Sequence, residues 1–302
     1  PGTPLGRVDF LEAILEVAVD GSKLLVLSTK GLYHVPLDGE GIPSGEPPLS
    51  VDPDCKGMAV DAGTLACSTS SGIKLYRMAD LAFLSNTQGT CTPSLLAIDS
   101  DKLYYVCGPY AGGQFQLESV DISQPVAPAV TGAFSFQLDD PPVGPLRAED
   151  LDVCGRYAYV ATWASGLEVI DTGSPSFEPY NIESGRRTTA CAQDKVYVQV
   201  LTQSEWGVRV YDASSPGSLV LVGEFPLGRS GLNDFTFNNG LMVIATDSEI
   251  ISTPIAALGE PSTYQRLPVL GSNSGLPAIA VDDANLYLAA MGTGLGIISK
   301  NP

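Results

Sequence analysis

One short phrase recurs seven times along this chain: an apolar pair, a turn containing Asp, Asn or Gly, and then a β-rich run. Two of the copies are Val19-Asp20-Gly21-Ser22-Lys23-Leu24-Leu25 and Val281-Asp282-Asp283-Ala284-Asn285-Leu286-Tyr287. Equivalent positions fall at residues 20, 61, 99, 154, 192, 238 and 282, which gives spacings of 41, 38, 55, 38, 46 and 44. A period of about 44 residues is typical of the blades of a β-propeller.

Each repeat contains four β-rich runs, which we label strands A to D. Strand A ends at the recurring phrase, strand B follows it, and strand C often begins with Gly. The predicted C strands are Gly31–Pro36, Gly72–Met78, Gly166–Asp171, Gly207–Asp212 and Gly294–Lys300. No helical period persists for the ten or more residues that a helix needs. The sequence therefore predicts an all-β, seven-bladed propeller with four-stranded blades.

The two ends of the chain complement each other. The seventh repeat stops after strand C, whereas residues 5–10 precede the first strand A and belong to no repeat. We expect this N-terminal segment to supply strand D of blade 7, because unpaired sheet edges favour aggregation. Residues 1–302 then form a single propeller domain. The chain begins at Pro1 without a signal-like segment, so we expect that a leader or anchor was removed.

Three turns between strands C and D carry a more specific signature. They are Val120-Asp121-Ile122-Ser123-Gln124-Pro125, Gly166-Leu167-Glu168-Val169-Ile170-Asp171-Thr172-Gly173-Ser174-Pro175 and Gly207-Val208-Arg209-Val210-Tyr211-Asp212-Ala213-Ser214-Ser215-Pro216. Each has an apolar strand ending in Asp, a small-residue turn and a Pro, and so resembles the LVIVD repeat family. The resemblance implies a propeller that is extracytoplasmic, secreted or attached to a bacterial cell surface, as in lipoproteins.

The placement of the six cysteines favours disulfides over metal binding. Relative to the turn position of their repeats, Cys55 and Cys67 lie at −6 and +6, and Cys91 and Cys107 lie at −8 and +8. This symmetry predicts the pairs Cys55–Cys67 and Cys91–Cys107. By elimination Cys154 pairs with Cys191, which requires Cα atoms within about 7 Å across neighbouring blades. A zinc site is disfavoured because no CxxC spacing occurs.

The charge balance excludes several classes of partner. The chain has 16 basic and 34 acidic residues, and its formal net charge of −18 repels nucleic acids and anionic membrane surfaces. No apolar run reaches the roughly 18 residues of a spanning helix. We therefore expect no nucleic-acid binding, no direct membrane insertion and a monomeric protein whose partner is a protein or glycan at the cell surface.

Residues for catalysis are scarce. The single histidine, His34, alternates with apolar neighbours and is expected to be a strand residue rather than a base, which disfavours triad chemistry. No dinucleotide, P-loop, zinc-protease or EF-hand motif is present. Acidic pairs offer oxygen ligands for Ca²⁺, but all lie in turns where Asp is structurally favoured. These pairs are Asp52/Asp54, Asp139/Asp140 and Asp282/Asp283.

A ligand site is predicted where the B–C and D–A connections gather at the channel mouth of a propeller. Its aromatic residues are Tyr110, Trp163 and Trp206, and its basic residues are Arg147, Arg186, Arg187 and Arg229. We expect them to bind an acidic group, although Glu149, Asp150, Glu183, Glu205 and Asp234 lie in the same connections and could pair with them.

The sequence thus favours an extracytoplasmic, non-catalytic binding or interaction scaffold that needs no cofactor. The alternative is a propeller hydrolase or lyase that uses carboxylates or Ca²⁺ at the channel mouth.

Overall fold

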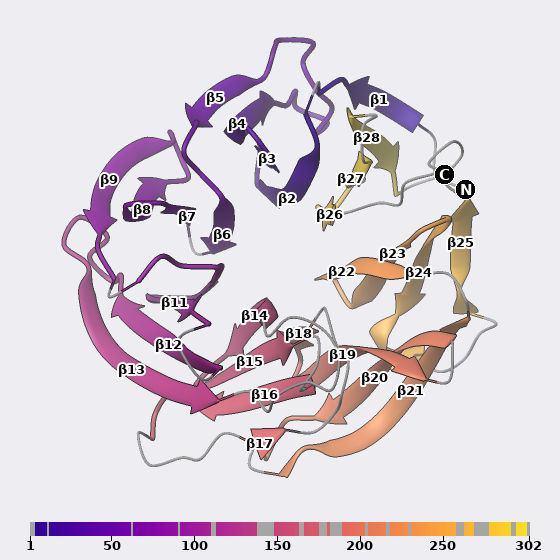
Figure 1. Ribbon diagram of the computed structural model, residues 1–302. Helices are drawn as coiled ribbons and strands as arrows, with labels where there is room; N and C mark the ends of the chain where they lie inside the picture. Colours follow the sequence, from indigo (N-terminus) through magenta and orange to yellow (C-terminus); the bar gives the residue numbers. More distant parts are fainter. Residues whose placement is uncertain are drawn as a thin grey trace. The chain divides into compact units, whose positions relative to one another are not determined.

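The computed structural model describes residues 4–10, 12–61, 63–89, 91–109, 113–137, 148–162, 166–174, 180–181, 189–202, 205–215, 218–228, 231–257, 263–268, 278–290 and 294–300. The strands form seven four-stranded antiparallel sheets, the blades of a seven-bladed β-propeller (Figure 1). The predicted fold class is confirmed. The chain divides into two compact units, Gly57–Glu224 on the one hand and Pro1–Lys56 with Phe225–Pro302 on the other.

The unit Gly57–Glu224 holds blades 2 to 5, and the last strand of blade 5 ends just beyond it. Blade 2 consists of β6 (Gly57–Asp61), β7 (Thr64–Thr69), β8 (Gly72–Arg77) and β9 (Ala82–Thr87). Blade 3 consists of β10 (Leu95–Asp99), β11 (Lys102–Cys107), β12 (Gln114–Asp121) and β13 (Ala129–Gln137). Blade 4 consists of β14 (Ala148–Cys154), β15 (Tyr157–Thr162), β16 (Gly166–Asp171) and β17 (Tyr180–Asn181). Blade 5 consists of β18 (Thr189–Ala192), β19 (Lys195–Thr202), β20 (Glu205–Asp212) and β21 (Val220–Gly228).

The other unit holds blades 1, 6 and 7. Blade 1 consists of β2 (Ile14–Asp20), β3 (Lys23–Ser28), β4 (Gly31–Pro36) and β5 (Leu49–Asp52). Blade 6 consists of β22 (Leu232–Asn238), β23 (Leu241–Thr246), β24 (Glu249–Pro254) and β25 (Gln265–Pro268), with the short 3-10 helix η2 (Ile255–Ala257) after β24. Blade 7 consists of β26 (Ala278–Val281), β27 (Asn285–Ala290), β28 (Gly294–Ser299) and β1 (Pro4–Val8).

The N-terminal strand completes blade 7, in agreement with the sequence. β1 runs antiparallel to β28, with Val8 opposite Leu295 and Pro4 opposite Ile298. The strand ends at Val8, two residues before the end of the predicted segment 5–10. The two ends of the described chain are therefore hydrogen-bonded neighbours in one sheet.

A glycine opens strand C in several blades because the chain must pass close to strand D there. Gly294 has a φ of +96°, and a Cβ on it would lie 2.3 Å from the carbonyl oxygen of Val8 in β1. Gly31 repeats this arrangement in blade 1, with a φ of +117° and 2.4 Å to the oxygen of Asp52. Any side chain at these positions would be strained in φ and would collide with backbone.

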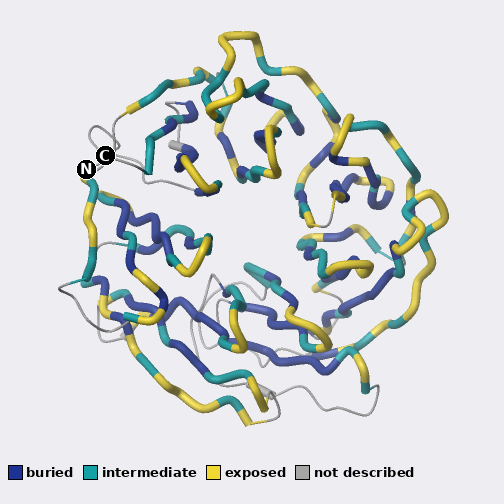
Figure 2. The backbone as a smooth tube through the Cα atoms, turned by 180° about the vertical axis from the view of Figure 1, so that it is seen from behind, coloured by how far each residue is buried: buried dark blue, intermediate teal, exposed yellow. Residues whose placement is uncertain are grey.

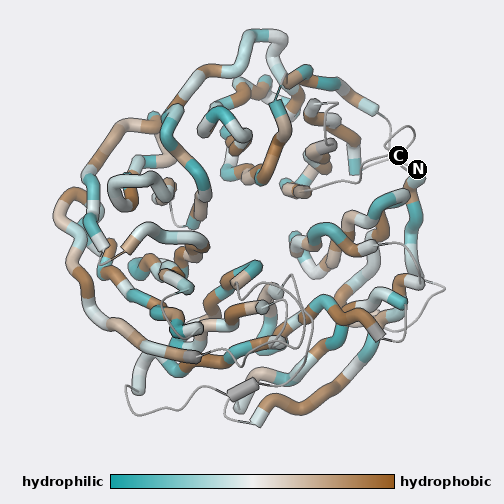
Figure 3. Tube along the Cα trace, viewed as in Figure 1, coloured by the Kyte–Doolittle hydropathy of each residue, from teal (hydrophilic) through white to brown (hydrophobic). Residues whose placement is uncertain are grey.

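The hydrophobic core lies between consecutive blades. One cluster joins Tyr104, Phe115 and Phe136 of blade 3 to Leu151 and Val160 of blade 4. Similar clusters join blades 2 and 3, 4 and 5, 6 and 7, and 7 and 1. The B strands are consequently covered on both faces and appear as buried and largely hydrophobic stretches (Figures 2 and 3). This double burial explains why they are continuous apolar runs in the sequence rather than alternating ones.

The repeat positions a tyrosine in the middle of strand B. The fifth residue after the turn position is Tyr104, Tyr159, Tyr197 or Tyr287 in blades 3, 4, 5 and 7, and each is at most 1% exposed. A large aromatic side chain at one repeated position fills the space between sheets.

Buried aspartates in the A strands connect neighbouring blades. Asp152 of β14 accepts a 2.6 Å hydrogen bond from the backbone nitrogen of Cys191, and Asp234 of β22 accepts one of 2.9 Å from Ile279. Burial raises the pKa of each carboxyl to about 7, although the two backbone amides bonded to each act in the opposite direction. These carboxyls have a structural role at blade boundaries.

Candidate functional site

Most of the predicted ligand site lies outside the described residues. This holds for Arg147, Arg186, Arg187, Arg229, Tyr110 and Trp163, so their convergence stays a prediction. Trp206 is described: it is half-buried on β20 and lies opposite Leu201 of β19, which is 44% exposed. The B–C hairpin of blade 5 therefore places the aliphatic side chain of Leu201 beside Trp206.

Two acidic residues that could have paired with the arginines have backbone partners. Asp150 accepts a 2.9 Å hydrogen bond from the backbone nitrogen of Thr189 in the next blade, and Asp234 bonds to Ile279 as described above. Each also accepts the amide of the residue that follows it. Their carboxylates thus stabilise the junctions between A strands.

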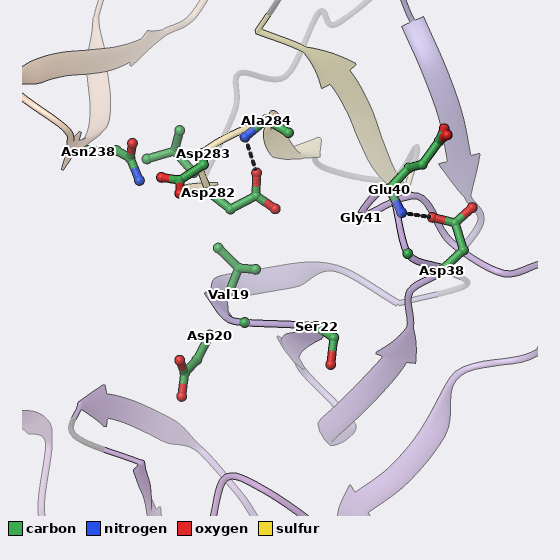
Figure 4. A pocket seen from close by; sticks show the side chains of 13 residues that line it. Val19, Asp20, Ser22, Asp38, Glu40, Gly41, Asn238, Asp282, Asp283 and Ala284 are labelled. Carbon is green, nitrogen blue, oxygen red and sulfur yellow. Dashed lines mark hydrogen bonds between the residues drawn. The ribbon is translucent and has the colours of Figure 1, made fainter.

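The structure has a pocket of about 560 Å³ in the unit that holds blades 1, 6 and 7. The A–B turns of these three consecutive blades line it through Asp20 and Ser22, Asn238, and Asp282 and Asp283 (Figure 4). The loop between strands C and D of blade 1 adds Asp38 and Glu40. In an antiparallel blade the A–B and C–D connections share one end, opposite the B–C and D–A connections. The pocket is therefore formed by connections of a different kind from those that carry the predicted ligand site.

Several of the pocket carboxylates help to build its walls. Oδ1 of Asp282 accepts hydrogen bonds from the backbone nitrogens of Ala284 (2.8 Å) and Asn285 (2.6 Å), and Oδ1 of Asp38 accepts those of Glu40 and Ile42, both at 2.9 Å. Such bonds are the reason why Asp is favoured in tight turns. Asp283 accepts a 2.6 Å bond from the side-chain amide of Asn239, which ties the turns of blades 6 and 7 together.

The loop of blade 1 is anchored on blade 7. The hydroxyl oxygen of Tyr287 lies 2.9 Å from the carbonyl oxygen of Gly41 and 2.6 Å from Oδ2 of Asp282, so its one proton is shared between these two acceptors. The side-chain amide of Asn285 donates to the carbonyl oxygen of Glu40. Burial, followed by the hydrogen bond to Asp282, raises the pKa of the Tyr287 phenol. Gly41 has a φ of +74°, and a Cβ there would lie 2.6 Å from the amide nitrogen of Asn285. This glycine allows the loop to approach closely enough to form the wall.

One lysine lies against the pocket wall. Nζ of Lys300 donates to the carbonyl oxygen of Asp282 at 2.6 Å and to Oδ1 of Asn238 at 3.1 Å. It holds the turns of blades 6 and 7 in place. Five acidic residues line the pocket, which is therefore strongly negative: Asp20, Asp38, Glu40, Asp282 and Asp283.

The pocket carboxylates are spread around the walls instead of converging on a point. Figure 4 shows the side chains of Asp20 and Glu40 pointing in different directions from separate walls. Within the described part of the chain, the group with three potential ligand atoms within 4.8 Å of one another is Cys91, Cys107 and Glu118. Its two sulfurs are bonded to each other, so this group is no metal site. The pocket is suited to an extended cationic group rather than to a chelated ion.

All three predicted disulfides are present in the structure. Cys91 bonds to Cys107 with a Cα separation of 5.9 Å, and Cys154 bonds to Cys191 with 6.1 Å. Cys55 and Cys67 are also disulfide-bonded and no cysteine is free, so these two pair with each other. The distance requirement for Cys154–Cys191 is met because the A strands of blades 4 and 5 pack side by side.

His34 lies on β4, as expected, and is half-buried. Burial lowers the pKa of its imidazole, with a smaller contribution from Lys23. A strand position of this kind gives the side chain no role in the pocket. Among the described residues, no helix is long and apolar enough to cross a membrane.

The turn phrase that revealed the repeat also contains the pocket residues Asp20, Asn238 and Asp282. In the sequence these residues are explained by the chemistry of tight turns, and the predicted ligands lie in the B–C and D–A connections instead. A signal was available in the loop Asp38-Gly39-Glu40-Gly41, which adds two acidic residues beside two of these turns. Its position could not be derived from sequence because it depends on contact with blade 7.

Comparisons with known proteins support the fold. The sequence model of the LVIVD repeat matches residues 147–179, which contain β14, β15 and β16. No curated protein matches the chain. Among solved structures, the WD40 β-propeller domain of Doa1 is similar with a TM-score of 0.71 and 10% identity, over 100% of this chain and 97% of that one.

Two further structures cover nearly the whole chain. Hydrazine synthase of Kuenenia stuttgartiensis has a TM-score of 0.69 and 13% identity, over 98% of this chain and 97% of its own. BamB from Moraxella catarrhalis has a TM-score of 0.61 and 13% identity, over 99% of both chains. At these identities the likeness shows a shared fold alone. The chain is a β-propeller that contains an LVIVD repeat in its fourth blade.

Proposed function

We propose that the protein is a non-catalytic binding module of an extracytoplasmic compartment, which holds a basic segment of a protein partner in the acidic pocket. The observation that carries the proposal is the pocket itself, formed by the A–B turns of blades 6, 7 and 1 and lined by five carboxylates. A concave site at converging turns is the usual place for a ligand. The surrounding chain, with a net charge of −18, attracts cationic partners from solution.

The electrostatics favour a partner with more than one positive charge. A single exposed ion pair contributes only about 0 to 1 kcal/mol. The carboxylates of Asp38 and Asp282 are held in place by backbone amides and add to the field of Asp20 and Glu40. A segment with several Lys or Arg residues can therefore gain from all the walls at once.

The state of the cysteines supports the proposed compartment. All six are disulfide-bonded, and disulfides persist in secreted and cell-surface proteins but are rare in the cytosol. The LVIVD repeat of blade 4 fits a secreted or surface-attached protein. The arginine and tryptophan set predicted for the B–C and D–A connections is proposed as a second contact, for an acidic group of a glycan or protein.

No bound metal is needed for this function. The candidate Ca²⁺ ligands Asp52 and Asp282 each accept the backbone amide two residues ahead, which is the structural role of Asp in a turn. The other pair, Asp139/Asp140, lies outside the described residues. We accordingly propose that the pocket acts through its fixed charges.

The test uses isothermal titration calorimetry of the full chain with a decapeptide that alternates Lys and Gly. The double variant Asp20→Asn/Glu40→Gln changes the pocket, and Asp101→Asn/Glu46→Gln makes the same change in net charge elsewhere. We expect at least a tenfold weaker Kd for the pocket variant and less than a threefold change for the control. Equal weakening of both variants would show a general charge effect and refute the proposal.

A further inference from the structure

The first residues of β21 form the most prominent apolar run on the described surface. Val220, Leu221 and Val222 are consecutive and are 57%, 48% and 52% exposed. Figures 2 and 3 show the beginning of this strand, at the bottom of each view, as both exposed and hydrophobic. Successive residues of a strand point to opposite faces, so both faces of the sheet are open at this point.

The rest of the strand behaves differently. Phe225 and Leu227 are 0% and 6% exposed and alternate with exposed Glu224 and Pro226, which is the pattern of a strand with one buried face. Three large aliphatic side chains on an uncovered strand end therefore need an explanation other than packing within the blade. Contiguous exposed apolar surface on a soluble protein commonly marks an interaction site.

β21 is also the outer strand of blade 5. The order of the sheet is β18-β19-β20-β21, so no strand of the described chain pairs with the outer edge of β21. Such an edge offers a row of backbone N–H and C=O groups to an added strand. Edge strands are usually protected by charge or proline, yet Val220–Gly223 contains neither.

Two charged residues next to this edge pair with each other. Nε of Arg209 lies 3.2 Å from Oε2 of Glu224, and the pKa of the Asp212 carboxyl is lowered by Ser214 and by Lys195. The first four residues of β21 carry no charge and three of them are exposed aliphatic residues, so an occupant should be apolar there. Pro226 has no N–H, which limits an added strand to about six residues from Val220.

A second copy of this chain is a poor occupant. Each copy carries a net charge of −18, so two copies repel one another as their edges approach. We propose that β21 receives an extended segment of a different protein, which adds a fifth strand to blade 5 and places aliphatic side chains against Val220, Leu221 and Val222. None of these three residues lines the acidic pocket.

The test selects displayed random octapeptides against the full chain and measures their binding to purified variants. Val220→Lys/Val222→Lys charges the strand end, and Val126→Lys is the control at another exposed valine. We expect enriched peptides with aliphatic residues at alternate positions, at least tenfold weaker binding to the double variant and unchanged binding to the control. Circular dichroism melting verifies that all variants remain folded.

Backbone methylation distinguishes strand addition from a simple apolar contact. Alternate N-methylation of an enriched peptide removes its donors and should weaken binding at least tenfold. Equal binding of the methylated peptide, equal binding to the double variant, or failure to enrich any peptide would overturn the proposal. Self-association of the wild type in sedimentation experiments, lost in the double variant, would assign the edge to a second copy and would also overturn it.

Discussion

Oδ2 of Asp152 accepts a 2.6 Å hydrogen bond from the backbone nitrogen of Cys191, the residue that is disulfide-bonded to Cys154. Strand A of blade 4 is thus joined to strand A of blade 5 by a covalent bond and by a buried carboxyl two residues away. Neither contact can form within a single blade. Both contacts therefore fix which strands of blades 4 and 5 lie next to each other.

The buried carboxyls predict an unusual dependence of stability on pH. The pKa of Asp152 and of Asp234 is about 7 in the folded protein, against an ordinary value of 3.8. The folded state therefore retains protons that the unfolded state loses, so this stabilisation is complete below pH 4 and is lost as the pH rises to about 7. Each group should lower the free energy of unfolding by roughly 1 kcal/mol per pH unit in that interval.

Urea unfolding between pH 4.5 and 8 measures this slope. Asp234→Asn should make the decline shallower by the contribution of one group, whereas the exposed control Asp101→Asn should leave it unchanged. Carbon-13 NMR of the wild-type carboxyls provides a second readout that does not depend on the variants. Titration of both groups near pH 4 would refute this prediction.

The disulfides should contribute unequally to stability. Cys154–Cys191 spans 37 residues and Cys91–Cys107 spans 16, and a longer closed loop restricts the unfolded chain more. Replacing both cysteines by Ala should cost about 4 kcal/mol for the first pair and about 3 kcal/mol for the second. Guanidinium unfolding of the two variants gives the comparison, and a larger loss for Cys91–Cys107 would contradict it.

The glycine that opens β28 should be indispensable for the attachment of β1. A side chain at Gly294 meets the backbone of Val8, whereas no atom lies within 4 Å of a Cβ built at Gly296 two residues later. Gly294→Ala should lower the melting temperature by several degrees and increase amide exchange in residues 4–8. Gly296→Ala is the matched control and should change neither quantity appreciably. Similar behaviour of the two variants would argue against the close approach.

Removal of the N-terminal strand tests its role more directly. Without residues 1–9 the outer edge of β28 loses its partner, and unpaired edges favour association. The truncated chain should aggregate or unfold without cooperativity, as measured by light scattering and calorimetry. A truncated chain that stays monomeric with an unchanged melting curve would show that β1 is dispensable.

The sequence predicted the blades well because each strand is encoded locally. Strand C in blade 1 spans Gly31–Pro36 in both the prediction and the structure, since a glycine begins the strand and a proline ends it. Contacts between blades could not be predicted from the sequence in the same way. The bond from Asp152 to Cys191, like the docking of Gly41 on Tyr287, joins residues whose proximity depends on packing that no local pattern encodes.

The pocket was missed for the same reason. Asp20 and Asp282 are explained locally as turn residues, and nothing in either repeat shows that the two turns share a cavity. The exposed edge at Val220–Val222 could not be recognised from the sequence either, because a run of aliphatic residues reads the same whether it is buried or exposed.

Hydrogen exchange of the full chain with and without the Lys-Gly decapeptide tests the central claim that the acidic pocket is the binding site. We predict slower exchange at residues 20–23, 38–42 and 282–286, which contain two A–B turns and the loop of blade 1. Protection confined to other connections, such as the hairpin that contains Leu201 and Trp206, or an even effect over the whole surface, would contradict the account.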